Sequence, residues 1–501
     1  MKVLILLLSL SLWTNSAIAV NDFSAIDKYV NAAKKEVGLP SGTAIAIVKD
    51  GKIIYEGYFG YANIKENIKV TNETAFYLAS LTKPMFALSI LLVEQHGDIK
   101  DTTLMSQMFP KLDIPFIDKN KIQLKHLMSH TSGIENRPLG YAFAYTGNHN
   151  KAQRHKLLTV TKIKGKGRLG EFDYTNLGYN IASIWVEDYY QQDWQEKISE
   201  LIYQPLGMVR TSSYMSDAAK QGIDVARPYG LYRKDPEEIL PFEKHNSTMH
   251  SAGGTISTAT DMARFLVAQL NRGRVDGKQV FPSVVIKKSH KKLATTDLKY
   301  GDFVRKGYAW GWYVGPYKNE EMYHHFGGVA GTDTHLSYML KHNIGLVILN
   351  NESRVSSKLT NAIADITYSI LLHKGNADDK ADAHIKKMKK YWTKLKTDIQ
   401  KSKDYKEKIK RERTMALSLE RSKYVGVFHN DLWGNMEVEL SCSNEFEFTL
   451  GELSAVATAY TKPNTMRVEF PAIGGGKIVT YKTEDGKVTE LEVFGEKFNK
   501  L

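Results

Sequence analysis

One segment of the sequence combines an almost wholly apolar helix with a polar tetrapeptide at its start. Residues 84–97 are mostly large apolar side chains and finish on glycine, the residue that most often ends a helix. A helix of this composition has to be buried in a large core. The chain is long enough for one, because 501 residues exceed a typical single domain and predict a large domain with a smaller one.

The tetrapeptide Ser80-Leu81-Thr82-Lys83 stands directly before this helix. Serine and lysine three residues apart share one helical face, so the amine can approach the hydroxyl. Burial lowers the pKa of a lysine and frees its amine as a base, while the helix N-terminus offers N–H groups to an oxyanion. The pattern recurs at Ser289-His290-Lys291-Lys292, but no apolar helix follows it there. The context therefore selects Ser80 as the candidate nucleophile.

Strand patterns lie near both ends of the first 370 residues. After a helix predicted over residues 22–36, Asp50-Gly51 separates two apolar runs between 43 and 57, which predicts a hairpin. Runs at 334–340 and 345–349 predict two more strands, followed by a helix over 357–372. Together with a mainly helical middle, they predict an α/β (α+β) fold in which an antiparallel sheet is flanked by helices and carries an inserted helical region, over residues 20–373.

The C-terminal part of the chain has two segments of different composition, a basic one over 374–423 and an alternating one over 424–501. Residues 374–423 hold 17 Lys/Arg and 8 Asp/Glu and so carry most of the net charge of +13. Helix-forming residues with interspersed acids predict a solvated connecting helix there, with contact to an anionic surface as the alternative. Because the excess charge is local, we expect no nucleic-acid partner. From 424 to 501, alternation and glycine turns predict a small all-β, barrel-like domain.

The N-terminus has the features of an export signal. A basic start at Met1-Lys2, an apolar stretch and Ala17-Ile18-Ala19 predict a signal peptide over 1–19, cleaved after Ala19. The alternative is an uncleaved anchor, although the apolar stretch is short for one. The mature protein is then expected in the periplasm or outside the cell, with no stable membrane span. Cys442 is the only cysteine, so an intramolecular disulfide is impossible.

Two further motifs follow Ser80 in a fixed order. Tyr174-Thr175-Asn176 and then His325-Phe326-Gly327 come after the serine, with the supporting stretches Ser129-His130-Thr131-Ser132-Gly133 and Ser251-Ala252-Gly253-Gly254 between them or nearby. In this combination, over about residues 25–370, the chain resembles the serine β-lactamase-like hydrolases. That family includes class C β-lactamases, penicillin-binding proteins with DD-peptidase activity, and related esterases and aminopeptidases. The β domain resembles one often appended to them.

The resemblance implies a two-step acyl transfer without metal or cofactor. Ser80 would attack a carbonyl, and Lys83 and Tyr174 would shuttle its proton. Asn176 would position the substrate or Lys83. A phenol with an ordinary pKa of about 10 can act as a base only if a cation such as Lys83 favours its phenolate.

The third motif would complete the substrate site. By the same resemblance, His325 and Gly327 would line it, and the N–H groups of Ser80 and Gly328 would form the oxyanion hole. Many β-lactamases carry lysine and a hydroxyl residue where this chain has His325 and Phe326. Since histidine is only partly charged and phenylalanine donates no hydrogen bond, carboxylate recognition is not indicated.

Three functions stay open at this point. The first is an exported enzyme that hydrolyses an ester or amide of a small molecule or peptide through an acyl-Ser80 intermediate. The second is a β-lactamase or D-alanyl-D-alanine carboxypeptidase, which needs a carboxylate-binding group elsewhere in the chain. The third is a catalytically silent binding or sensing module on the same scaffold, against which the intact Ser80, Lys83 and Tyr174 count.

Overall fold

An antiparallel sheet of eight strands forms the centre of the structure, a computed structural model that describes residues 22–501 except 166 and 234. The strand order is β11-β12-β13-β14-β15-β16-β1-β2, so the N-terminal hairpin lies beside the last strand of the sheet, in the register Ala46↔Val347. The strands are β1 (Thr43–Lys49), β2 (Lys52–Phe59), β11 (Ala294–Tyr300), β12 (Phe303–Tyr308), β13 (Tyr313–Tyr317), β14 (Glu320–Val329), β15 (Thr332–Met339) and β16 (Ile344–Asn350).

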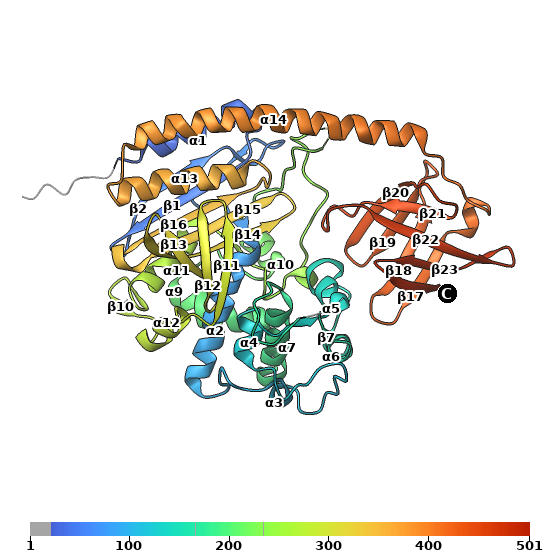
Figure 1. The fold of residues 1–501 in the computed structure, drawn as a ribbon, viewed down its shortest axis with the longest axis horizontal. Coiled ribbons are helices and arrows are strands. Elements are labelled where there is room, and N and C mark those ends of the chain that lie inside the picture. The colour runs from blue at the N-terminus through green and yellow to red at the C-terminus, as the bar shows by residue number, and fades with distance from the viewer. Residues whose placement is uncertain (1–21, 166, 234) are drawn as a thin grey trace, which may run out of the picture.

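Helices cover both faces of this sheet, which explains the unbroken apolar run of β1. Ala44 and Ala46 face one hydrophobic cluster, whereas Ile45 and Ile47 face another on the opposite side. Figure 1 shows α1, α13 and α14 along one side of the sheet and the other helices below it. The helices of these two layers are α1 (Ser24–Val37), α2 (Thr82–His96), α11 (Ala259–Leu270), α12 (Ser283–Ser289), α13 (Ser356–Leu371) and α14 (Ala377–Glu412).

The inserted helical region lies between α2 and α11 in the sequence. Its longest helix, α7, packs against α4, and the buried body of α2 lies against them. The helical elements are α3 (Met105–Met108), α4 (Leu124–Met128), α5 (Arg137–Tyr141), η2 (Ala142–Thr146), α6 (Lys151–Thr159), α7 (Leu177–Tyr190), α8 (Trp194–Ile198), η3 (Ser199–Tyr203), α9 (Gln204–Leu206), α10 (Met215–Gln221) and η4 (Asn246–Thr248).

Short strand pairs and a 3-10 turn join these parts. The turn η1 (Ala79–Leu81) follows β5 and leads directly into α2. The short strands are β3 (Tyr61–Asn63), β4 (Ile68–Lys69), β5 (Phe76–Tyr77), β6 (Ile134–Glu135), β7 (Lys162–Ile163), β8 (Ile256–Ser257), β9 (Arg274–Val275) and β10 (Lys278–Gln279).

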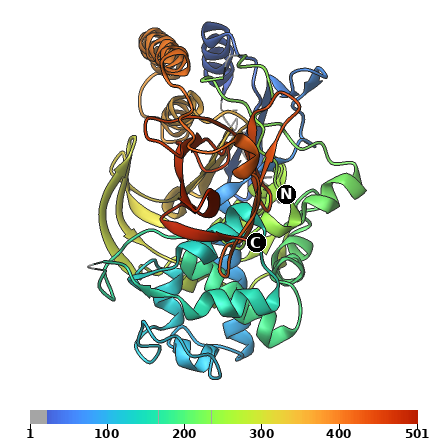
Figure 2. The ribbon, with the colours of Figure 1, turned by 90° about the vertical axis from the view of Figure 1, so that its right-hand side faces the viewer.

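Helix α14 differs from the solvated connector that its charge predicts. Met388, Trp392 and Leu395 lie on one face and are buried against α1 and α13. Figure 2 shows α14 and α1 side by side, with α13 beneath them. Between its many lysines, the helix carries an apolar stripe at helical spacing. Because this stripe is buried, the first two thirds of the helix belong to the core of the large domain.

The C-terminal strands close into a barrel, as the sequence predicts. They follow one another in the order β17 to β24, and the interior is filled by fully buried side chains such as Phe428, Phe448 and Phe498. The strands are β17 (Gly426–Asn430), β18 (Gly434–Leu440), β19 (Phe446–Leu450), β20 (Leu453–Ala459), β21 (Thr465–Val468), β22 (Lys477–Glu484), β23 (Lys487–Val493) and β24 (Glu496–Lys500). η6 (Arg421–Lys423) precedes them. The predicted α/β fold with an appended β domain is therefore confirmed.

The barrel docks on the inserted helical region. The ring of Tyr141 lies 5.0 Å from that of Trp433 and 5.2 Å from that of Phe494, and Arg137 Nη1 donates to the Phe494 carbonyl at 2.7 Å. The predicted signal peptide lies outside the described residues. Within 22–501, leaving aside 166 and 234, no helix is both long and apolar enough to cross a membrane.

Candidate active site

Ser80 lies in the tight turn η1, between β5 and α2. The preceding residue, Ala79, has φ of +49°, a left-handed conformation that costs energy for any residue with a Cβ. Thr82 Oγ1 donates to the Ala79 carbonyl at 2.8 Å and holds this turn closed. Ser80 is therefore presented, partly exposed, at the N-terminal end of a buried helix, as its sequence context predicts.

Lys83 is fully buried and points at Ser80. Its Nζ lies 3.0 Å from Ser80 Oγ and donates to Asn176 Oδ1 at 2.8 Å and to the Ala252 carbonyl at 2.7 Å. Burial holds the pKa of Lys83 well below its usual range. Asn176 Oδ1 and the Ala252 carbonyl can only accept, so a neutral amine gives both of its N–H groups to them and turns its lone pair toward the Ser80 hydroxyl.

Tyr174 reaches the same oxygen from the other side. Its hydroxyl donates to Ser80 Oγ at 3.0 Å, and its ring lies 4.9 Å from Lys83 Nζ. Burial of the hydroxyl raises the pKa of Tyr174, although the hydrogen bond with Ser80 lowers it in part. Burial lowers the pKa of Lys83 and raises that of Tyr174, so this environment does not favour the phenolate that a base role for Tyr174 would need. This geometry suits Lys83 as a base and Tyr174 as a proton donor.

Asn176 stands at the start of α7 and contacts Lys83 directly. Of the two roles that the resemblance implies for it, the geometry supports positioning of Lys83. The Ala252 carbonyl shares this task and was not identified from the sequence. Its signal was the stretch Ser251-Ala252-Gly253-Gly254, which the sequence presented only as a supporting feature.

His325 lies on β14 on the side of the aromatic residues around Ser80, but it is only 1% exposed. The nearest acceptor of its Nδ1 is the Phe326 carbonyl at 2.8 Å, so Nδ1 carries the proton. Nε2 is then free to accept from the Tyr308 hydroxyl at 3.3 Å. Burial holds the pKa of His325 well below its usual range. It therefore presents no positive charge to a ligand.

Gly327 brings β14 against the nucleophile turn. A Cβ at this position would lie 2.1 Å from the Leu78 carbonyl oxygen and 3.1 Å from Ser80 N, so no side chain fits. Gly328 follows it on the exposed side of the strand. This arrangement fits the oxyanion site that the resemblance implies, made by the N–H groups of Ser80 and Gly328.

Phe326 does not face Ser80. It packs against Tyr300, Phe303 and His335 on the opposite face of β14, because neighbouring side chains of a strand alternate. Its ring is therefore not placed to contact a substrate at Ser80. The aromatic wall of the site is formed instead by Tyr313, which stacks on Tyr174 at 6.3 Å, and by Phe172 and Tyr308, which pack on Tyr313.

Arg305 is a cation near the site that no motif indicated. Its guanidinium lies 3.8 Å from the ring centroid of Tyr313, which stacks at 6.3 Å on Tyr174, and its Nε donates to His324 Nε2 at 3.2 Å. Arg305 forms no ion pair with the acidic groups of the described residues. A partly buried guanidinium of this kind can accept an anionic ligand as its partner.

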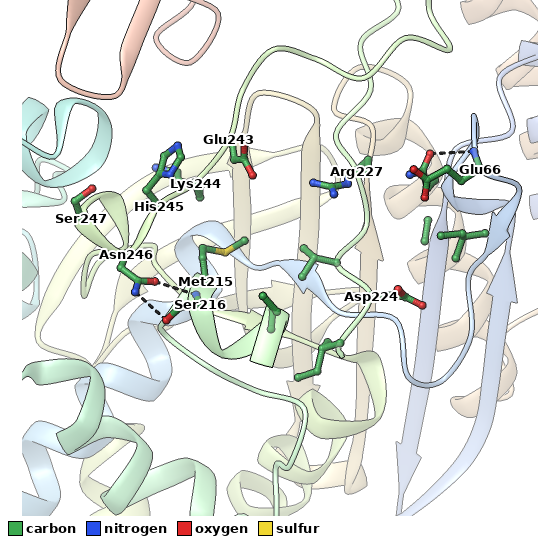
Figure 3. Close-up of a pocket in the computed structure, with 17 residues that line it drawn as sticks. Glu66, Met215, Ser216, Asp224, Arg227, Glu243, Lys244, His245, Asn246 and Ser247 are labelled. Carbon is green, nitrogen blue, oxygen red and sulfur yellow. Dashed lines mark hydrogen bonds between the residues drawn. The ribbon is translucent and has the colours of Figure 1, made fainter. Parts of the chain in front are cut away.

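A polar cavity of about 600 Å³ lies elsewhere on the large domain (Figure 3). Its lining includes Glu66, Arg227 and Asn246, but neither Ser80 nor Tyr174. Asn246 exchanges hydrogen bonds with Ser216 across it, at 2.9 and 3.1 Å. The catalytic constellation is therefore separate from this cavity.

Comparison with known proteins agrees with the geometry. A model of the family described as Beta-lactamase matches residues 26–366. Penicillin-binding protein 4* of Bacillus subtilis (strain 168) is 26% identical over 328 residues, which cover 62% of this chain and 68% of that protein.

Two solved structures show the same fold. The octameric penicillin-binding protein homologue from Pyrococcus abyssi has a TM-score of 0.61 at 20% identity and covers 96% of this chain and 100% of its own. A D-amino acid amidase from Ochrobactrum anthropi SV3, complexed with L-phenylalanine amide, has a TM-score of 0.55 at 18% identity, over 73% of this chain and 99% of its own. The first likeness extends over the barrel.

Proposed function

The chain belongs to the β-lactamase family of serine hydrolases, and from that premise we propose that it hydrolyses an ester or amide of a small molecule or peptide through an acyl-Ser80 intermediate. One observation carries the proposal: Ser80 Oγ is contacted at 3.0 Å both by the buried amine of Lys83 and by the hydroxyl of Tyr174. A base and an acid that meet at one serine oxygen are the requirement for acyl transfer.

In the acylation step the neutral Lys83 amine takes the proton of Ser80 while Oγ bonds to the carbonyl carbon. The oxyanion is held by the N–H groups of Ser80 and Gly328. The Tyr174 hydroxyl gives its proton to the departing alkoxide or amine, and the Lys83 ammonium restores that proton. Water then attacks the ester on Ser80, and the same groups return the serine to its starting state.

A second candidate is a β-lactamase or D-alanyl-D-alanine carboxypeptidase. It needs a cation for the substrate carboxylate, which His325 does not supply. Arg305, above Tyr313 and without an acidic partner in the described part of the chain, supports this candidate.

A substrate panel separates the candidates. Purified protein, Ser80→Ala and Arg305→Gln are tested on a neutral p-nitrophenyl ester, an amino acid amide and a fluorescent penicillin. Serine-dependent turnover of the ester and amide, unaffected by Arg305→Gln, supports the first function. Serine-dependent labelling by penicillin that Arg305→Gln weakens about tenfold or more supports the second. Absence of any Ser80-dependent reaction contradicts both and leaves a silent binding module.

Export is a separate part of the proposal and rests on the sequence of residues 1–19 alone. We propose that the protein is cleaved after Ala19 and acts outside the cytoplasm. N-terminal sequencing of the protein from its native cells tests this proposal. A mature chain that starts at Val20 is expected, and a chain that keeps residues 1–19 contradicts cleavage.

A further inference from the structure

His130 lies directly behind Tyr174 and has no role in the proton transfers described above. It follows α4 in the Ser129–Gly133 stretch and is 1% exposed. Its backbone has φ of +60°, an uncommon conformation for a residue other than glycine. Such a conformation persists only where the surrounding structure imposes it.

Two hydrogen bonds connect His130 to the residues on either side of Tyr174. The carbonyl of His130 accepts from the Asp173 N–H at 2.8 Å, and its ring Nδ1 accepts from the Thr175 N–H at 3.3 Å. The imidazole ring itself lies 4.4 Å from the Tyr174 ring, centroid to centroid. One residue therefore holds the backbone before and after the tyrosine as well as one face of its ring.

The other rings beside Tyr174 are more distant: those of Tyr313 and His325 lie 6.3 and 6.1 Å from it, centroid to centroid. The tyrosine exposes 38% of its surface, whereas the His130 ring is enclosed by Tyr174, Tyr179, Tyr308 and Phe172. A neutral imidazole that accepts at Nδ1 carries its proton on Nε2. That atom is buried and has no partner in the described part of the chain. Among the described residues, the hydrogen bond from the Thr175 N–H to Nδ1 is therefore the one polar contact of the His130 ring.

We propose that His130 is a positioning residue for Tyr174, which fixes the phenol hydroxyl against Ser80 Oγ. The inference rests on the proposed function, since it assigns a partner to the group that donates the leaving-group proton. Burial holds the pKa of His130 well below its usual range, so the ring is neutral. It therefore acts through hydrogen bonding and packing, and does not exchange protons with the substrate.

His126, four residues earlier in α4, supplies a matched control. Its Nδ1 also accepts from a backbone N–H, that of Gln123 at 3.1 Å, but it is half-buried and does not contact Tyr174. The variants are His130→Ala, His130→Asn and His126→Ala. Asparagine keeps an acceptor near the position of Nδ1 and tolerates positive φ, so it should restore part of what alanine loses.

The kinetic readout is kcat on an amide, where the leaving group needs a proton, and on a p-nitrophenyl ester, where it does not. His130→Ala should lower kcat on the amide by about 100-fold and on the ester by only a few-fold, with little change in KM. His126→Ala should leave both unchanged. In a Tyr174→Phe background His130→Ala should add almost nothing, because the two residues act as one unit. The proposal is overturned if His130→Ala lowers kcat on the amide as much in the Tyr174→Phe background as in the unmodified protein. It is also overturned if His126→Ala lowers kcat as much as His130→Ala does.

A structural readout keeps this test independent of turnover. In protein labelled with 3-fluorotyrosine, the Tyr174 signal is assigned by its disappearance in Tyr174→Phe. It should move in His130→Ala, return toward its original position in His130→Asn and stay in place in His126→Ala. A signal unmoved by His130→Ala overturns the proposal even if the enzyme is inactive. Lack of Ser80-dependent turnover in the unmodified protein contradicts the proposed function instead.

Discussion

Lys83 has three hydrogen-bond partners, and two of them cannot donate. The carbonyl of Ala252 and Oδ1 of Asn176 fix the two N–H groups of the neutral amine, which leaves its lone pair for Ser80. An ammonium at the same place would fill all three bonds but could accept no proton. The function of the site therefore depends on the burial that lowers the pKa of Lys83.

Replacing Lys83 tests this dependence. Lys83→Arg introduces a permanently charged guanidinium, which cannot act as a base, and Lys83→Met removes the amine, so both should lower kcat/KM by about 10³-fold. Steady-state kinetics on the ester substrate measure the loss. Lys244→Met removes another buried lysine, one that bonds only to carbonyl groups, and should retain activity. Near-normal rates in Lys83→Met would rule out the amine as the base.

Asp333 makes stability depend on pH. It is 6% exposed, it accepts from Thr360 Oγ1 at 3.2 Å, and burial raises its pKa to about 8. The unfolded chain releases this proton near pH 3.8, whereas the folded chain keeps it up to about pH 8. The free energy of unfolding should therefore fall as the pH rises across this window, by up to about 5 kcal/mol.

Asp333→Asn should remove this dependence, because the amide keeps the acceptor and cannot ionise. Urea unfolding at pH 5 and pH 8 is the measurement. The variant should be more stable than the unmodified protein at pH 8 and show a smaller change between the two values. Asp297→Asn, whose side chain is 84% exposed, serves as the control. Equal pH dependence in Asp333→Asn and the unmodified protein would contradict the assignment.

Sequence reasoning found the residues whose relation is local. Ser80 and Lys83 are three positions apart in one helical segment, so their proximity follows from helix geometry. The hydrogen bonding of His325 could not be predicted, because its partner Tyr308 lies on β12, which the sheet places two strands away from β14. Arg305 was missed for the same reason.

At the scale of elements, β14 and the nucleophile turn form one unit. They approach so closely that residue 327 has no room for a side chain. A hairpin signal predicted β1 and β2, and two apolar runs predicted β15 and β16. Strands β11 to β13 were not predicted, since their exposed and buried residues do not alternate regularly.

Gly327→Ala tests the contact between these elements. Its Cβ would meet the Leu78 backbone at 2.1 Å, so β14 or the turn must shift by about 1 Å, which is enough to lower kcat by about 10²-fold. Gly140→Ala is the control, because its Cβ would meet no atom within 4 Å. Circular dichroism confirms that both variants fold, and ester kinetics give the result. Full activity in Gly327→Ala would contradict the close packing described above.

At the scale of the whole molecule, the barrel is attached at two places. It is joined to the sheet domain by α14 and docks on the helical region through the aromatic group of Tyr141, Trp433 and Phe494. The sequence predicted a barrel from its own alternation. Its docking site could not be predicted, because the contact depends on side chains almost 300 residues apart whose partners no local pattern identifies.

Tyr141→Ala should loosen this docking by about 2 kcal/mol, since it removes the aromatic contacts and leaves the barrel core intact. Limited proteolysis between α14 and β17 measures the effect. Cleavage there should be faster in Tyr141→Ala than in Tyr405→Ala, which replaces a tyrosine that is 62% exposed. Equal cleavage rates would show that the aromatic contacts of Tyr141 do not hold the barrel in place.

The central claim is that Ser80 is the nucleophile, and covalent labelling tests it most directly. The full-length protein and Ser80→Ala are treated with a fluorophosphonate, and their intact masses and labelled peptides are compared. We predict one adduct per chain, on Ser80, and none on Ser80→Ala. An adduct of equal extent on Ser80→Ala, or an unlabelled protein that still hydrolyses the ester, would contradict the account.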